Sequence, residues 1–377
     1  MAAGEATSST GGGYRVTVPA PRPQWSTAFR GDPHAQAFHS PAWMDAVRAA
    51  GGFEDVSRMY ETPDGRVLVL PVAGRSYLGG AAYYQGSFPP DWGIGGVISA
   101  DPIHPEDLSE ICADLRRQRT VLRTYIRPAA RTGRLWEKAD LPGVKWAPRL
   151  CHVLDLEGGF ETVWERRFSK SARRYVRKAQ NAGVVVERDD TGARLPEYFA
   201  LMEESLKRWA ERQHEPLVLT RLRARRRQTV QKMQTLARAM PGSFRLYLAV
   251  WEGRPIAGTI AYRATGSHAT SGAMIKDLAG PIGANYLLDR TAIEDACTAG
   301  STHFDFGESG TSPGLAMYKT RFGAEPAAYR TLAVERLKFT EADRFLRTVV
   351  KRTIGFRDSS DAQPSPAGSP AGDAEVH

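Results

Sequence analysis

The order of apolar and polar positions in the second half of the chain predicts alternating strands and helices. Short apolar runs predict strands, and apolar residues at three- and four-residue spacing predict helices. The predicted strands are 151–155, 184–187, 244–251, 254–263, 268–276 and 303–307, and the predicted helices are 160–182, 195–213, 219–240 and 283–300. A last helix is predicted to open near Met317. This order is typical of a unit that mixes helices with a central sheet.

The first half of the chain, from residue 14 to about 149, shows a similar order of elements. Ser40 is a suitable N-cap for a helix, and Pro41 suits its first position. Two strands, a helix and a third strand follow, at 56–61, 66–73, 105–118 and 120–126. The two halves together predict an α/β (α+β) protein built from two similar units.

The ends of the chain have a different composition from the two halves. The predicted divisions are a disordered N-terminus at 1–13, a first lobe at 14–149, a second lobe at 150–338, a basic helix at 339–356 and a disordered tail at 357–377. Small and polar residues dominate both ends, and such segments do not bury enough apolar surface to fold.

Composition is that of an ordinary globular protein, with one bias in charge. Of 377 residues, 42% are hydrophobic and 25% charged. No apolar run approaches the ~20 residues of a membrane helix, and the N-terminus has no signal pattern. The three cysteines are far apart and form no metal motif, which predicts a reducing, cytoplasmic setting without a metal site. The net charge of +9 favours an anionic partner.

Five cations lie on one face of the predicted helix at 160–182. They are Lys170, Arg173, Arg174, Arg177 and Lys178, and their spacing places them on one side, while the apolar residues recur on another. No acidic residue interrupts this stripe, so its cations repel each other unless an anion binds. The sequence therefore predicts a phosphate-binding face. A solvated basic face, or one neutralised by acids from the other lobe, is the alternative. The second basic run, 221–227, surrounds its helix and is interpreted as a solvated surface.

Two segments resemble a known family. The strand His303-Phe304-Asp305-Phe306-Gly307 is followed by an aromatic-lysine pair, Tyr318-Lys319, and by Phe322-Gly323-Ala324-Glu325-Pro326. Together with the basic helix, they resemble the FemABX-like (BioF2-like acetyltransferase) branch of the GNAT acyltransferases. The resemblance implies two tandem GNAT-like lobes, each with a mixed, mainly antiparallel central sheet flanked by helices.

The resemblance also implies a place for an acyl donor. In GNAT enzymes a glycine-rich turn and a helix N-terminus hold the pyrophosphate of coenzyme A. Lys276, Gly283 and Asn285 occupy the equivalent stretch here, but the usual glycine pattern is not met and Pro281 removes one N–H donor. No tightly bound cofactor is predicted. The donor is expected to be a co-substrate, either acyl-CoA or the aminoacyl-tRNA that many FemABX-like proteins use.

Candidate catalytic residues follow the same strand. Acyl transfer to an amine needs a proton acceptor and a group that stabilises the oxyanion. Asp305 and Glu308 are the acceptor candidates, and His303 is a convenient base that is more often a packed residue at a strand entrance. By resemblance, Lys319 matches the lysine near the acyl-transfer site and would stabilise developing charge.

Aromatic residues predict where the acceptor binds. Tyr84 and Trp92 lie in a glycine- and proline-rich stretch, and Tyr318 precedes the lysine; all three are candidates for an acceptor cleft. The sequence contains no hydrolase, nucleotide-phosphatase or metalloprotease motif.

The predicted function is N-acyl or aminoacyl transfer to the amine of a small-molecule or peptide-like acceptor. A non-catalytic RNA- or peptide-binding protein on a decayed acyltransferase fold is the alternative. The partners are the amine acceptor and, for one donor class, tRNA, with no membrane span. The identity of the acceptor and the oligomeric state stay open.

Overall fold

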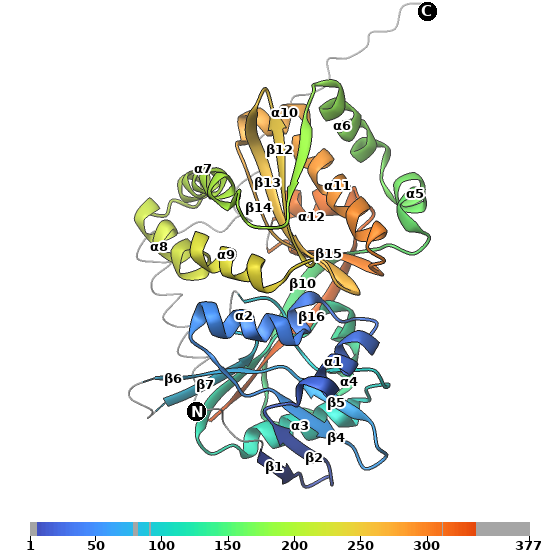
Figure 1. Cartoon of the computed structure of the whole chain (residues 1–377), viewed down its shortest axis with the longest axis vertical. Coiled ribbons are helices and arrows are strands. Elements are labelled where there is room, and N and C mark those ends of the chain that lie inside the picture. The colour runs from blue at the N-terminus through green and yellow to red at the C-terminus, as the bar shows by residue number, and fades with distance from the viewer. Residues whose placement is uncertain (1–5, 78–81, 90–91, 311, 337–377) are drawn as a thin grey trace, which may run out of the picture.

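The computed structural model describes residues 6–77, 82–89, 92–310 and 312–336, and shows two lobes stacked along its long axis (Figure 1). The elements of the first lobe are β1 (Ala6–Ser9), β2 (Arg15–Val18), α1 (Arg22–Gly31), η1 (Ala37–His39), α2 (Pro41–Gly51), β3 (Glu54–Asp55), β4 (Arg58–Glu61), β5 (Val67–Leu70), β6 (Ala73–Tyr77), β7 (Ala82–Ser87), β8 (Ile98–Ser99), α3 (Pro105–Arg117), β9 (Val121–Ile126), η3 (Ala130–Thr132) and α4 (Gly133–Lys138).

The second lobe begins with a long strand that leaves the first. Its elements are β10 (Lys145–Asp155), α5 (Gly159–Thr162), η4 (Val163–Arg167), α6 (Lys170–Asn181), β11 (Val185–Asp189), α7 (Leu195–Gln213), α8 (Leu217–Arg227), α9 (Val230–Ala239), β12 (Phe244–Trp251), β13 (Arg254–Tyr262), β14 (Gly266–Met274), α10 (Lys276–Ile282), α11 (Ala284–Thr298), β15 (His303–Glu308), α12 (Pro313–Thr320) and β16 (Glu325–Glu335).

One mixed sheet runs through both lobes. Within the described residues its eleven strands follow the order β11-β12-β13-β14-β15-β10-β16-β9-β7-β6-β3. Most neighbours are antiparallel, and β14–β15 and β7–β9 are parallel. The strand β16 pairs with β10 along 325–333 and with β9 along 332–335, so it joins the two halves of the sheet. The expected division at 149/150 falls inside β10.

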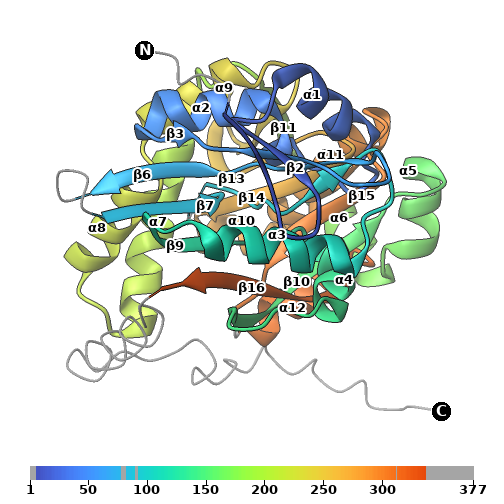
Figure 2. The same cartoon turned by 90° about the horizontal axis from the view of Figure 1, so that it is seen from below.

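A second, five-stranded sheet lies in the first lobe, in the order β1-β2-β4-β5-β8. Figure 1 labels β1, β2, β4 and β5, and Figure 2 shows the molecule from below, with α3 toward the viewer. The strand β1 pairs with β2 from Ala6 to Ser9, where the sequence predicted disorder. Apolar side chains of α3, such as Leu108 and Ile111, pack against strands of this lobe. The predicted helix at 339–356 and the tail at 357–377 lie outside the described residues.

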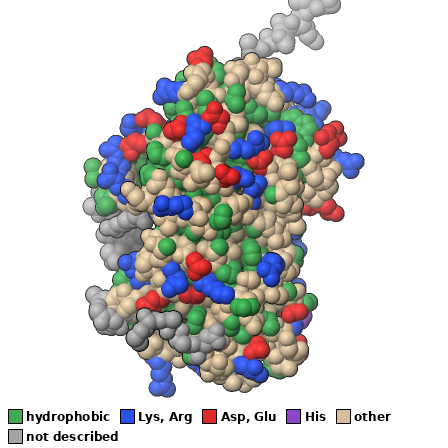
Figure 3. All heavy atoms as spheres, in the orientation of Figure 1, with side chains coloured by type: hydrophobic (Ala, Val, Ile, Leu, Met, Phe, Trp, Pro, Cys, Tyr) green, Lys and Arg blue, Asp and Glu red, His purple; other side chains and the backbone are tan. Residues whose placement is uncertain are grey.

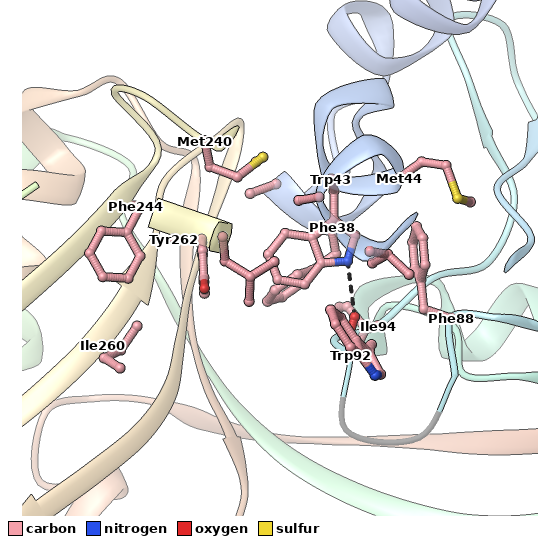
Figure 4. Close-up of a cluster of buried hydrophobic side chains, with 14 of the residues drawn as sticks. Phe38, Trp43, Met44, Phe88, Trp92, Ile94, Met240, Phe244, Ile260 and Tyr262 are labelled. Atoms are coloured by element: carbon pink, nitrogen blue, oxygen red, sulfur yellow. Dashed lines mark hydrogen bonds between the residues drawn. The ribbon is translucent and has the colours of Figure 1, made fainter. Parts of the chain in front are cut away.

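A buried aromatic cluster holds the lobes together (Figure 4). Phe38 and Trp43 of the first lobe pack against Tyr262 of β13, with ring centroids 5.5 and 5.0 Å from the tyrosine ring. The Trp43 indole N–H donates to the backbone oxygen of Trp92 at 3.0 Å. Burying these large rings contributes strongly to stability. The lobes therefore share a core across their contact.

Helices cover both faces of the second lobe's sheet. The helices α6 and α11 lie on one face, where Phe168 packs edge-on against Phe322 at 5.1 Å. On the other face, α7 contacts β13 and β14.

On the surface, acidic and basic side chains are interspersed over the face shown in Figure 3.

Two predicted helices are divided in the structure, each at a residue that caps the next helix. The helix expected at 160–182 breaks at Phe168 because Ser169 accepts a hydrogen bond from Ala172 N and starts α6. The helix expected at 219–240 becomes α8 and α9 because the Thr229 hydroxyl caps α9 at Lys232 N. The predicted cap of α2 is confirmed, since the Ser40 hydroxyl accepts from Trp43 N at 3.1 Å.

Candidate functional site

A large cleft opens between the lobes. Its volume is about 1720 Å³, and strands of the first lobe and of the shared sheet face the helices α7, α8 and α9 across it. The charged lining is mainly basic: Arg75, Arg123, Arg127, Lys145, Arg149, Arg221, Arg223, Arg225 and Lys232, with Glu203 and Glu308. Such a cleft can admit a substrate larger than a simple amine and favours one that carries negative charge.

The strands β14 and β15 separate beside this cleft. They pair in parallel over three positions only, ending at His268 opposite Asp305. Beyond that point β14 stays paired with β13, while β15 stays paired with β10, so a wedge-shaped gap opens between the two strands. Past this last pair, among the described residues, the facing edges have no sheet partners. Backbone N–H groups freed in this way can stabilise an oxyanion.

His268 and Asp305 form a pair at the narrow end of the gap. Nδ1 of His268 lies 3.4 Å from Oδ2 of Asp305. The carboxylate also accepts a hydrogen bond from Gly307 N at 2.7 Å and one from Gln36 Nε2 at 3.4 Å. Phe38 meets the imidazole edge to face at 5.2 Å, which fixes the ring. His268 lines the cleft, whereas Asp305 lies behind it and is only 3% exposed.

Asp305 is held ionised in spite of its burial. Burial alone raises its pKa, but the electrostatic attraction of the neighbouring His268 side chain and the hydrogen bonds from Gly307 and Gln36 together lower the pKa from 3.8 to about 2. A carboxylate with a depressed pKa stabilises the fold above its ordinary pKa, and that contribution disappears as the pH falls through the folded value.

Replacing Asp305 with asparagine is therefore expected to cost about 2 kcal/mol of stability near neutral pH. The difference between wild type and Asp305→Asn should shrink as the pH falls from about 4 to about 2, because the wild-type carboxylate takes up a proton there. Urea unfolding at a series of acidic pH values measures this. A stability difference between the two proteins that stays constant across that pH range would contradict the depressed pKa of Asp305.

Glu308 lies in the cleft as one member of an ion-pair network. Its Oε1 accepts from Arg127 at 2.9 Å and from the Tyr329 hydroxyl at 2.5 Å, and its Oε2 lies 3.4 Å from Arg149. Both carboxylate oxygens of Glu308 are therefore engaged by charged or hydroxyl donors. Glu308 therefore ties the end of β15 to β9, β10 and β16.

Lys319 is buried behind the end of β15 rather than in the cleft lining. Its Nζ donates to the backbone oxygens of Gly307 and Glu308 at 2.8 and 2.9 Å. Burial is the main cause that lowers the pKa of this lysine from 10.5 to about 8. Its ammonium group stays mainly protonated at neutral pH, so it places positive charge next to the residues that border the gap.

The predicted acceptor aromatics separate into two groups. Tyr84 and Trp92 line the cleft, and the Lys232 ammonium lies 3.5 Å from a ring centroid of Trp92. Tyr318 is not part of the lining: its hydroxyl donates to Asp289 Oδ2 at 2.6 Å and to Asn285 O at 3.1 Å. Tyr318 therefore anchors α12 on α11.

The basic stripe of α6 faces solvent on another part of the second lobe. Lys170, Arg174, Arg177 and Lys178 are exposed, and Arg173 donates to the backbone oxygen of Glu165 at 3.0 Å. No carboxylate of the described residues pairs with the five cations, so acids of the other lobe do not neutralise the stripe. None of the five lines the cleft.

The segment expected to cradle a pyrophosphate is a short helix, α10. Gly283 has φ of 76° and its N–H donates to Gly280 O at 3.2 Å, so this donor is already used. A side chain at Gly283 would meet Tyr175 O of α6 at 2.8 Å, which explains the glycine by close packing. Asn285 offers its backbone oxygen to Tyr318. Lys276 is exposed as a whole residue. Partial desolvation of its ammonium group, together with the nearby charges of Arg212 and Arg208, lowers its pKa.

Sequence reasoning missed His268 and named the other histidine. His303 is 1% exposed, its Nδ1 lies 2.9 Å from the Thr302 hydroxyl, and burial lowers its pKa to about 4. It is a packed residue outside the cleft lining. His268 was only the first residue of a predicted strand. Its partnership with Asp305 depends on a parallel register that no local pattern encodes.

Comparison with known proteins shows what this chain is similar to. Residues 166–329 match the family described as Acetyltransferase (GNAT) domain. A crystal structure of FemX aligns over 83% of this chain and 96% of that chain, with a TM-score of 0.60 and 12% identity. The C-terminal domain of a putative lysylphosphatidylglycerol synthetase from Agrobacterium fabrum aligns over 85% and 94%, with a TM-score of 0.46 and 13% identity. No curated protein sequence matches the chain.

Residues 166–329 of the second lobe are thus similar to a GNAT acetyltransferase domain, and such a domain supports acyltransferase activity in general. The two-lobed fold is similar to that of FemX, which confirms the predicted fold class, and the family match confirms the GNAT part of the predicted resemblance. Among the described residues, no helix combines the length and apolar character needed to cross a bilayer. The same residues contain no group of three or more potential metal ligands.

Proposed function

We propose that this protein transfers an acyl or aminoacyl group from a phosphate-bearing carrier to the amine of an acceptor that enters the cleft between the lobes. The separation of β14 and β15 beside that cleft is the observation that carries the proposal. A gap between parallel strands offers unpaired backbone donors for a carbonyl, and the adjoining cleft has room for the acceptor.

The charge distribution supports a carrier rich in phosphate. The exposed cations of α6 have no carboxylate partner among the described residues, so an anion docking there would relieve their mutual repulsion. The helix α10, which fills the expected pyrophosphate turn, makes that turn a poor cradle for coenzyme A. We therefore favour aminoacyl-tRNA as the donor, with acyl-CoA as the second candidate.

The test compares binding of bulk tRNA and of acetyl-CoA to the purified protein at two salt concentrations. Binding of tRNA that falls steeply with salt, without a response to coenzyme A, supports aminoacyl transfer. Binding of acetyl-CoA alone supports acyl-CoA-dependent transfer and reassigns α6 to an anionic acceptor. Transfer of label from the bound donor to an amine then tests catalysis. Binding without transfer to any amine tested would favour the non-catalytic alternative.

Charge reversal on α6 is expected to weaken tRNA binding at least tenfold at moderate salt. The variant is Arg174→Glu with Lys178→Glu, two exposed residues four positions apart on the stripe. The slope of log affinity against log salt should become shallower by roughly 2, because two phosphate contacts are lost. Filter binding across a salt series measures both quantities.

A matched control exists on the first lobe. Arg134 and Lys138 of α4 are also exposed, four positions apart and remote from the cleft lining. The double variant Arg134→Glu with Lys138→Glu changes the net charge by the same amount. A difference in tRNA binding between the two double variants therefore reflects where the charges lie, because the number of charges changed is equal. Equal losses in the two double variants would contradict a specific role for α6.

A further inference from the structure

We infer that His268 is the general base that takes the proton from the attacking amine, and that Asp305 positions it. This inference rests on the proposed function and assigns the proton-transfer step of that same site. Neither the family match nor the sequence pattern assigns a role to His268.

His268 lies where the gap between the strands meets the cleft. His268 is the last residue of β14 that pairs with β15, so it lies at the narrow end of the gap where the strands separate. It lines the cleft, although its side chain is nearly buried. An acyl carbonyl held in the gap and an amine in the cleft would therefore meet beside this imidazole.

The two ring nitrogens of His268 have different surroundings. Nδ1 faces Asp305 at 3.4 Å, and Nε2 makes no hydrogen bond to any described residue. Gly307 lies beside this nitrogen: a Cβ there would be 3.8 Å from Nε2, an ordinary van der Waals contact, and the backbone φ of 69° disfavours any side chain at this position. A carboxylate on Nδ1 favours the tautomer that leaves Nε2 as a proton acceptor. The distance of 3.4 Å is long for a hydrogen bond, as is common before substrate binds.

The lobe contact holds the pair in place. Gln36 of the first lobe reaches Oδ2 of Asp305, and Gly266 N at the start of β14 donates to Ala35 O at 2.8 Å. Phe38 packs against the imidazole from the same segment. The geometry of the base therefore depends on the correct contact between the two lobes.

The other groups near the gap are occupied. Glu308 accepts from Arg127 and Tyr329, and the Lys319 ammonium donates to two backbone oxygens. Glu308 would have to give up these contacts to accept a proton from the amine, and the Lys319 ammonium already carries its proton. Nε2 of His268 has no such contact to lose.

The amine nitrogen attacks the acyl carbon and forms a C–N bond, and its proton moves to Nε2 of His268. Collapse of the tetrahedral intermediate breaks the C–O bond to a tRNA ribose or the C–S bond to coenzyme A. The proton on Nε2 then passes to the departing alkoxide or thiolate, which returns the imidazole to its starting state.

Chemical rescue tests this assignment. His268→Ala is expected to lower kcat about 10²–10⁴-fold with little change in KM, because general-base catalysis contributes on that order. Imidazole added to the assay should restore part of the lost rate with saturation, since it can occupy the space left by the side chain. His268→Gln should lose rate without rescue, because its side chain fills the space. The His268→Gln variant also tests the role of His268 if the His268→Ala variant fails to fold.

A matched histidine provides the control. The His303→Gln variant changes a histidine of the neighbouring strand β15 that lies outside the cleft lining. Added imidazole should not alter the transfer rate per folded molecule of this variant. Asp305→Asn should lower kcat while leaving Nε2 in place, so its rate should not respond to imidazole.

Two outcomes overturn the assignment alone: wild-type kcat in a folded His268→Gln variant, or a folded His268→Ala variant whose lost rate imidazole leaves unchanged. Absence of any transfer by the wild-type protein would overturn the proposed function, and the assignment with it.

Discussion

Replacing Phe38 with alanine is expected to lower the free energy of unfolding by about 3–5 kcal/mol. The Phe38 side chain is fully buried where the lobes meet, and it contacts Trp43, Tyr262 and His268 with centroid distances of 4.8, 5.5 and 5.2 Å. Alanine would leave a cavity among groups that belong to both lobes and cannot easily collapse. Denaturant unfolding followed by tryptophan fluorescence measures the loss.

Two further variants sharpen this prediction. Phe38→Leu keeps most of the volume and should cost about 1–1.5 kcal/mol, while Phe199→Ala at the partly exposed margin of the same cluster should cost less than Phe38→Ala. The activity of Phe38→Leu should also fall, because the ring that fixes His268 is gone. A Phe38→Ala protein as stable as Phe199→Ala would show that the lobe contact is not the shared core described above.

Replacing Lys319 with methionine is expected to lower the transfer rate about 10²-fold or more. Methionine keeps the length of the side chain but donates no hydrogen bond, so the backbone oxygens of Gly307 and Glu308 lose their partner. Unpaired buried acceptors cost about 1–3 kcal/mol each, and the end of β15 would shift relative to the gap. The positive charge beside the developing oxyanion would be lost as well.

Steady-state kinetics and thermal unfolding of the same Lys319→Met preparation separate the two effects. Lys138→Met, an exposed lysine of α4, controls for the loss of one charge. If the protein only binds its ligand, Lys319→Met should alter stability while no turnover exists to be lost. A stable Lys319→Met variant that keeps the wild-type kcat would contradict both the catalytic and the positioning role of this lysine.

Much of the fold was predictable because its signals are local. The Ser40 cap, the helix α11 and the short strand β15 are each encoded within a single segment, and all three are found where expected. The breaks at Ser169 and Thr229 were missed because the apolar repeat continues through them, and capping becomes visible only when the backbone turns.

The candidate site was predictable in part. The sequence singled out the segment that contains Asp305, Glu308 and Lys319, and the structure places this segment beside the gap, but the sequence did not predict the contacts of each side chain. Glu308 is engaged by Arg127, which is far away in the sequence, and Tyr318 turns toward α11 instead of the cleft. Such partners depend on which strands become neighbours, and residue types alone do not state that.

The sequence by itself determined the class of the fold, most of the helix–strand order of the second lobe and the basic face of α6. These depend on periodicity and spacing within single segments. Only the tertiary structure decided that β16 would join the two lobes into one sheet, that a cleft would open between them, and that His268 would face Asp305. The physical reason is that strand register and lobe packing minimise the free energy of the whole chain, and no single segment carries that information.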